Sequence, residues 1–264
     1  MNRRDILKAA LLASVGWSYA SVSYAQITNV NDAINKAGRQ RMLSQRMAKA
    51  YLQIGMNVNL ESSKKILDTS LSLFDRQLIE LKNFSTSADI KAAVLNIDKT
   101  WIAYKDLLLG KAPNVADAKQ ILRFSDVLLE MTDHVTQQLE KYANSKTGSL
   151  VNISGRQRML SQRMAKMYQA IHWEVAGADT ASALEAARKE FNYNMRSLEA
   201  NPNNTKAIQT ELTFAQQQWL FFDHAIRQAP DLRMRQQYAT TVATTSERIL
   251  QQMDIVTSQY EKLS

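Results

Sequence analysis

Apolar residues recur with a helical period along most of the chain, and the predicted helix around residue 47 carries two such stripes. The first stripe consists of Leu43, Met47, Tyr51, Ile54 and Val58. The second stripe lies on the opposite side and consists of Gly38, Met42, Gln45, Leu52 and Met56. At about 100° per residue each stripe forms one face of a helix, so we expect this helix to have two neighbours.

Breaks rich in polar residues, glycine or proline divide each half of the chain into four predicted helices. In the first half these cover residues 31–59, 62–83 and 90–109, followed by a long helix that ends near Tyr142, with a turn and cap at 85–87. In the second half, the expected breaks are Gly177 after the first helix, residues 201–204 after the second, and residues 229–230 before the fourth. Four helices with short links are typical of an up-and-down bundle.

The two halves are copies of one another. The segment GRQRMLSQRMAK occurs at residues 38–49 and again, unchanged, at residues 155–166. Near the end of each half the offset grows by about one helical turn, and Glu140 then matches Glu261. We therefore expect an all-α protein in which two tandem up-and-down four-helix bundles, residues 26–145 and 146–264, are related by a pseudo-twofold axis.

The N-terminal residues have the features of an export signal. Arg3 and Arg4 precede a short apolar stretch, and small residues stand at Ser23 and Ala25. The paired arginines favour the twin-arginine route over the general secretory route. An uncleaved membrane anchor fits less well, because Lys8 interrupts an apolar stretch far shorter than the ~20 residues that span a bilayer. We expect residues 1–25 to be a signal peptide and the remainder to be periplasmic.

Composition and charge narrow the possible functions. The chain has no cysteine, so stability must come from helix packing rather than disulfide bonds. Its formal charge is +8, but we expect no nucleic-acid partner, because the export signal directs the protein away from nucleic acid. His134, His172 and His224 are scattered and form no metal-binding pattern. We therefore expect no enzyme activity, no cofactor and no metal. Because no later segment is apolar over a length that could span a membrane, we expect a membrane-bound signalling protein as the partner that carries the signal across.

Two arginines at equivalent positions of the repeat are the candidate binding residues. Arg41 and Arg158 lie at the margin of the second stripe, so packing the two repeated helices together brings their guanidinium groups close. A small planar oxyanion between them would relieve the repulsion. Gly38 and Gly155 would permit close backbone approach. The alternative stays open that these arginines are solvated and form ion pairs within their own helix, although the repeated segment contains no Asp or Glu.

Residues 34–46 resemble the N-terminal ligand-binding domain of type IV pili methyl-accepting chemotaxis transducers and the periplasmic segment of nitrate/nitrite sensor kinases. In that family the domain is a four-helix bundle, and nitrate binds between the first helices of two subunits through the arginine of a Gly-x-x-Arg-Met motif. The resemblance implies that Arg41 and Arg158 hold nitrate or nitrite. The remaining implied ligand-binding residues are Gly38, Gly155, Lys36, Asn35 and Asn152.

The expected function is thus a periplasmic sensor that binds a small oxyanion between the repeated helices and passes the signal to a membrane partner. Family members usually carry a transmembrane helix and a kinase or chemotaxis module, and this chain shows neither. Copy two also has Ile153 where copy one has Lys36, so the two half-sites differ. The alternative is a ligand-free helical module that docks on a chemosensory or type IV pilus-linked signalling protein.

Overall fold

The computed structural model describes residues 27–84, 86–228 and 234–263, and every regular element in these ranges is an α-helix. The helices of the first copy are α2 (Val30–Gly55), α3 (Leu60–Phe84), α4 (Ala88–Gly110) and α5 (Val115–Ala143). Those of the second copy are α6 (Lys146–His172), α7 (Thr180–Glu199), α8 (Lys206–Arg227) and α9 (Arg235–Glu261). The predicted all-α class is confirmed. The expected export signal lies outside the described residues.

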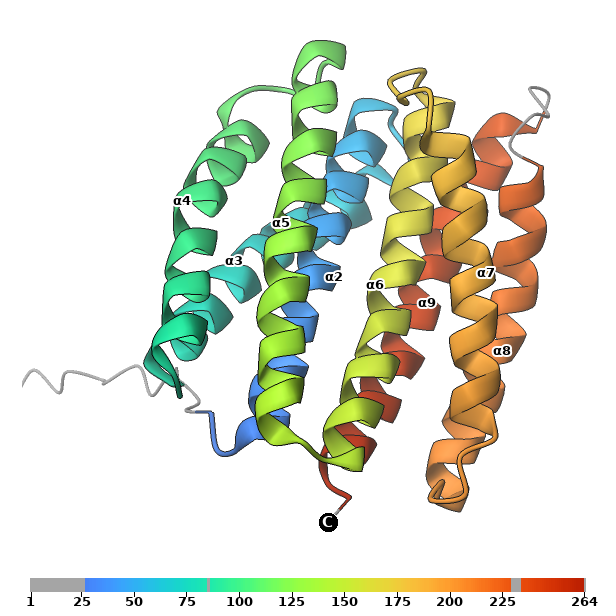
Figure 1. The fold of residues 1–264 in the computed structure, drawn as a ribbon. Helices are drawn as coiled ribbons and strands as arrows, with labels where there is room; N and C mark the ends of the chain where they lie inside the picture. Colours follow the sequence, from blue (N-terminus) through green and yellow to red (C-terminus); the bar gives the residue numbers. More distant parts are fainter. Residues whose placement is uncertain (1–26, 85, 229–233, 264) are drawn as a thin grey trace, which may run out of the picture.

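Each copy forms an antiparallel bundle, and the two bundles meet through their first helices. Within the first copy α2 packs against α3 and α5, and α4 packs against α3 and α5 in turn. The second copy repeats this arrangement with α6 to α9. The helices α2 and α6 lie side by side and run in the same direction, so the approximate twofold axis runs along them (Figure 1).

Local sequence explains where the helices begin. The Ser87 hydroxyl accepts a hydrogen bond from the Ile90 N–H at 3.2 Å and caps α4, within the predicted turn at 85–87. Ser145 caps α6 in the same way by accepting from the Gly148 N–H at 3.0 Å. Asn144 closes α5 with a left-handed backbone, at φ 44°. The two copies are therefore joined by a tight link, which holds α5 and α6 antiparallel.

The first helix of each copy ends earlier than predicted. We expected α2 to reach residue 59 and α6 to reach Gly177, but the helices end at Gly55 and His172. The chain leaves the helix through residues with positive φ, Asn57 and Asn59 in copy one and Glu174 in copy two. Gly177 has no positive φ and is not the terminator. The predicted opening of α9 at residues 229–230 lies outside the described residues.

The helices α2 and α6 are buried on nearly all sides. Between Gly38 and Gln53 only Arg39 and Arg46 are not buried, and the equivalent stretch of α6 behaves alike. The prediction of two neighbours for the motif helix was wrong, because α2 packs against α3, α5 and α6. The motif helices thus form the centre of the molecule, and their polar side chains need partners inside the protein.

Candidate functional site

Arg41 and Arg158 lie together between α2 and α6, and both side chains are fully buried. A β-carbon placed on Gly38 would lie 3.1 Å from Arg41 Nη2 and 3.8 Å from Arg158 Nη2. The same test at Gly155 gives 3.0 Å to Arg158 Nη2 and 3.7 Å to Arg41 Nη2. The two glycines therefore make room for the guanidinium groups, which corrects the expectation that they serve backbone contact.

The Arg41 guanidinium is held by residues of both copies. Its Nη1 donates to Asp133 Oδ1 on α5 at 2.6 Å, and its Nη2 donates to Asn152 Oδ1 on α6 at 2.7 Å. The amide nitrogen of Asn152 in turn donates to Glu140 Oε2 at 2.5 Å. This chain of contacts fixes the guanidinium plane and ties α2, α5 and α6 together.

Arg158 has the equivalent set of partners. Its Nη1 donates to Asp254 Oδ1 on α9 at 2.5 Å, and its Nη2 donates to Asn35 Oδ1 on α2 at 2.8 Å. The amide nitrogen of Asn35 donates to Glu261 Oε2 at 2.5 Å. Each asparagine therefore contacts the arginine of the other copy, and the contacts follow the twofold relation.

Each aspartate also binds a second arginine, from the other copy. Asp133 accepts from Arg156 at 3.2 Å, and Asp254 accepts from Arg39 at 2.5 Å. The motif does lack carboxylates, but the fourth helix of each copy supplies them. The alternative of solvated arginines paired within their own helix does not hold for Arg41, whose partners lie on α5 and α6.

Burial and the neighbouring charges together set the pKa values of this cluster. Burial lowers the pKa of Arg158 to about 10, and the neighbouring positive charge of Arg39 adds to this effect. The pKa of Arg41 is lowered for the same reason. For Asp133 burial raises the pKa, but the attraction of Arg41 and Arg156 outweighs it and the pKa falls below its usual value. Burial therefore disfavours the charged form of both central arginines, whereas the arginines favour the charged form of Asp133.

One donor of each central arginine is left over. Among the described residues no hydrogen-bond acceptor reaches the buried Nε of Arg41 or the buried Nε of Arg158. A buried polar group without a partner costs about 1–3 kcal/mol. The two equivalent N–H groups are thus available to an acceptor that can reach between α2 and α6.

Lys36 is not part of this cluster. Its Nζ lies 3.2 Å from Asp32 and 3.0 Å from Glu80, a residue of α3. Its charge is therefore engaged by these two carboxylates. The structure brings together the other predicted residues, which are Arg41, Arg158, Gly38, Gly155, Asn35 and Asn152.

Sequence reasoning missed the acidic half of the cluster. Asp133 and Asp254 are related by the same longer offset that pairs Glu140 with Glu261 near the ends of the copies. Duplicated carboxylates at matching positions were therefore the available signal. Their role as partners of the arginines depends on how α5 and α9 pack, which the repeat alone does not give.

A second pair of buried cations lies further along the motif helices. Lys49 Nζ on α2 contacts Glu247 Oε1 on α9 at 2.5 Å, and Lys166 Nζ on α6 contacts Asp126 Oδ1 on α5 at 2.6 Å. Both contacts cross between the copies. Burial raises the pKa of Glu247, but Lys49 and Arg46 outweigh this effect and lower it to about 2.

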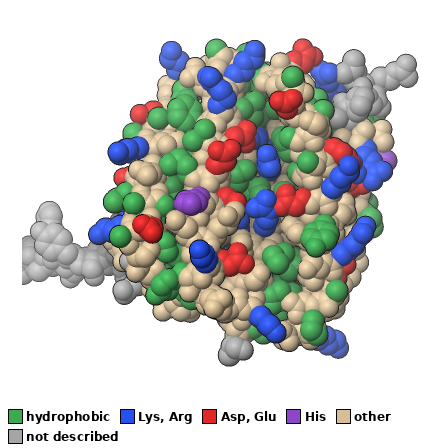
Figure 2. Space-filling view, in the orientation of Figure 1, with side chains coloured by type: hydrophobic (Ala, Val, Ile, Leu, Met, Phe, Trp, Pro, Cys, Tyr) green, Lys and Arg blue, Asp and Glu red, His purple; other side chains and the backbone are tan. Residues whose placement is uncertain are grey.

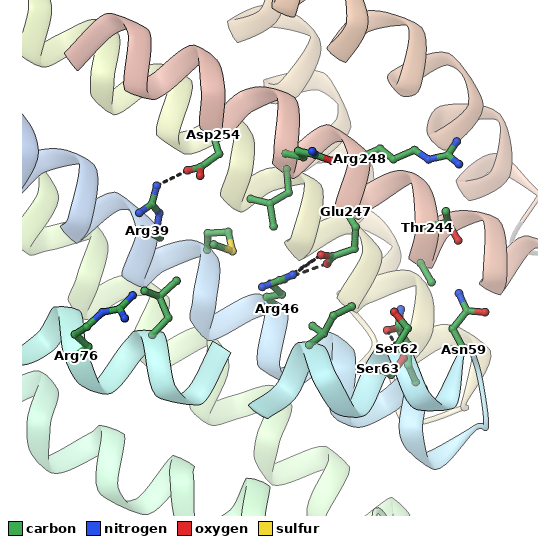
Figure 3. A pocket seen from close by; sticks show the side chains of 17 residues that line it. Arg39, Arg46, Asn59, Ser62, Ser63, Arg76, Thr244, Glu247, Arg248 and Asp254 are labelled. Atoms are coloured by element: carbon green, nitrogen blue, oxygen red, sulfur yellow. Dashed lines mark hydrogen bonds and ion pairs between the residues drawn. The ribbon is translucent and has the colours of Figure 1, made fainter. Parts of the chain in front are cut away.

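Two large cavities flank the motif helices. One, of about 630 Å³, lies between α2, α3 and α9; in it Arg39 points toward Asp254 and Arg46 toward Glu247 (Figure 3). The other, of about 640 Å³, lies between α5, α6 and the start of α7. Arg41 and Arg158 line neither cavity, but their neighbour Asp254 lines the first. That cavity therefore gives access to the carboxylate that holds Arg158.

The surface shows acidic and basic side chains side by side. On the face drawn in Figure 2 they are interspersed rather than gathered into fields of one sign. Among the helices of the described residues, none combines the length and the apolar character needed to cross a membrane.

Comparison with known proteins gives one family. The family model for the N-terminal region of type IV pili methyl-accepting chemotaxis transducers matches residues 23–124 and again residues 142–245. The two matches correspond to the two copies and together cover most of the chain. No match was found among curated proteins or among solved structures.

Proposed function

Because the chain belongs to the family of type IV pili methyl-accepting chemotaxis transducer N-terminal domains, which are signalling rather than catalytic domains, we propose that it is a periplasmic sensor for a small oxyanion. The ligand is nitrate or nitrite, bound between α2 and α6 by Arg41 and Arg158. The signal passes to a membrane-bound partner.

The observation that supports this proposal is the pair of buried Nε groups without an acceptor. They belong to equivalent arginines whose Nη2 atoms lie within 4 Å of the same points above Gly38 and Gly155. Nitrate is planar and monovalent, and its three oxygens can accept hydrogen bonds from two guanidinium groups at once. A β-carbon on Gly38 would already come within 3.1 Å of a guanidinium nitrogen, so the arginine side chains must shift for nitrate to bind between them.

The proposed mechanism is an exchange of partners. Arg158 is held by Asp254, whose side chain is 42% exposed and lines the cavity in Figure 3. An anion that enters this cavity replaces Asp254 as the partner of the Arg158 guanidinium, and the Asp254 side chain moves into solvent. The ion pair between α6 and α9 is then lost, while the anion joins α6 to α2 through Arg158 and Arg41. The two helices shift, and a partner reads the changed surface, within the limit set by the ligand's different affinities for the two states.

The test is a thermal unfolding titration of the protein with nitrate, nitrite, chloride and sulfate at constant ionic strength. A ligand at 100 times its Kd adds about 2.7 kcal/mol, which raises the Tm by roughly 5–10 °C for a chain of this size. We expect this rise with nitrate or nitrite only. Arg41→Gln and Arg158→Gln should abolish it.

The matched control is Arg76→Gln. Arg76 is an exposed residue of α3 that lines the cavity in Figure 3. This variant should respond to nitrate like the original protein. If both Arg41→Gln and Arg158→Gln fold and keep the response, the anion binds elsewhere.

A second candidate function is the ligand-free docking module. It is favoured by the observation that Asp133 and Asp254 already neutralise the two arginines, at 2.6 and 2.5 Å. In this case the charge cluster only fixes the relative position of the two copies. The absence of a Tm rise with all four anions would favour this candidate over the sensor.

A further inference from the structure

The cavity between α5, α6 and α7 differs from its counterpart in one respect that matters for binding. The two cavities occupy equivalent places, each between the first two helices of one copy and the fourth helix of the other. In the first cavity Glu247 accepts from both Arg46 and Lys49. In the second cavity these residues correspond to Asp126, Arg163 and Lys166.

The shorter carboxylate reaches only one of the two cations. Asp126 accepts from Lys166 at 2.6 Å, and the hydroxyl of Ser125 accepts from the same Nζ at 3.0 Å. Among the described residues no carboxylate pairs with Arg163, and its buried Nε has no hydrogen-bond acceptor. The second copy therefore has an uncompensated guanidinium where the first copy has a closed ion pair.

Other positive groups surround the same cavity. Lys119 and Arg123 of α5 line it together with Arg163 and Lys166, against the two carboxylates of Asp126 and Asp179. Asp179 stands at the N-cap position of α7 but makes no side-chain cap hydrogen bond. The Thr180 N–H donates to the Gly177 carbonyl at 3.1 Å, and the positive end of the helix dipole adds to the attraction for an anion.

Most of the remaining cavity wall is apolar. Its apolar side chains include Leu122, Met167, Ala170, Val175, Ala176 and Ala183. The volume of about 640 Å³ lies within the usual range of small-molecule sites, roughly 300–1,000 Å³. A ligand with one anionic end and an apolar body therefore matches the lining better than an inorganic ion does.

We propose that this cavity binds a small organic carboxylate, with its carboxylate on Arg163 and its apolar body against Met167 and Val175. The site is separate from the pair of Arg41 and Arg158 and does not depend on the function proposed for that pair. It gives the protein a second ligand, of a different chemical class from nitrate.

The test is isothermal titration calorimetry of the whole protein with hexanoate, hexanamide and acetate at constant ionic strength. We expect saturable binding of hexanoate, at least tenfold weaker binding of acetate, and no binding of the uncharged hexanamide. Arg163→Gln should weaken hexanoate binding at least tenfold. Arg76→Gln, in the equivalent cavity of the other copy, is the matched control and should leave hexanoate binding unchanged.

A second variant tests the asymmetry without removing the arginine. Asp126→Glu restores the longer carboxylate found at Glu247, so it should pair with Arg163 and also weaken hexanoate binding. Circular dichroism checks that both variants remain folded. Absence of hexanoate binding by the original protein would overturn the inference, and so would hexanoate binding by Arg163→Gln or Asp126→Glu as tight as that of the original protein. So would loss of hexanoate binding in Arg41→Gln, because the carboxylate would then occupy the central pair.

Discussion

The most direct test of the central charge cluster is Asp254→Asn. The change keeps the shape of the side chain and removes its charge, so Arg158, which is fully buried, loses its carboxylate partner. Breaking a buried ion pair from one side costs about 3–5 kcal/mol. Asp254 is 42% exposed, and solvent screens part of the interaction, so we expect a loss of about 1–3 kcal/mol.

The same substitution at the equivalent residue of the first copy, Asp133, gives a second stability loss for comparison. Asp133 is only 20% exposed, so Asp133→Asn should cost more than Asp254→Asn. The surface control is Glu61→Gln. Glu61 is 83% exposed, and its partner Lys64 is 51% exposed. Surface pairs of this kind contribute about 0–1 kcal/mol. The expected order of stability loss is Asp133→Asn, then Asp254→Asn, then Glu61→Gln.

Equilibrium urea denaturation followed by circular dichroism measures these losses, first in chloride and then in nitrate at equal ionic strength. If nitrate binds Arg158, it should recover part of the stability lost in Asp254→Asn, because the competing carboxylate is gone. A loss no larger than that of Glu61→Gln would refute the reasoning about burial. Equal stabilisation by chloride and nitrate would refute the exchange of partners.

Two further predictions concern acid stability and the central glycines. Glu247 has a pKa of about 2 in the folded protein against 4.5 in the unfolded chain, so its stabilising effect is complete above pH 4.5 and is lost as the pH falls toward 2. In an acid titration, the Glu247→Gln variant should therefore lose less stability over this pH range than the original protein does. Gly155→Ala should destabilise the protein by about 1 kcal/mol in urea denaturation, since the new methyl group crowds Arg158 at 3.0 Å, whereas Gly110→Ala meets no atom within 4 Å and should cause no loss.

The repeat carried most of the information that sequence alone could give. It predicted the two copies, the number of helices in each, and the meeting of equivalent arginines near the glycines. Asn35 and Asn152, taken from the motif resemblance, do contact Arg158 and Arg41. These features depend on the internal symmetry and on helical periodicity, and both can be read from the order of the residues.

The partners of the buried cations could not be read in this way. Asp133 is far from Arg41 in sequence, and the contact between them depends on how α5 is rotated against α2. The burial of Arg41 was missed for the same reason, because a helical wheel shows faces but not how many neighbours cover them. The early end of α6 at His172 depends on the positive φ of Glu174, a residue type that gives no turn signal.

The crossed contacts lead to a last prediction, that the first copy alone forms a homodimer. In the full chain Arg41 needs an asparagine from the other copy, and Lys49 needs a carboxylate from the other copy's fourth helix. Residues 27–145 contain both equivalents, Asn35 and Asp126, so a second molecule of the fragment can supply these two crossed contacts. Without a second molecule the buried face of α2 would be exposed to water. Analytical ultracentrifugation should therefore show dimers that Asn35→Leu weakens, whereas a folded monomer at high concentration would mean that α2 is stable without the α6 contact.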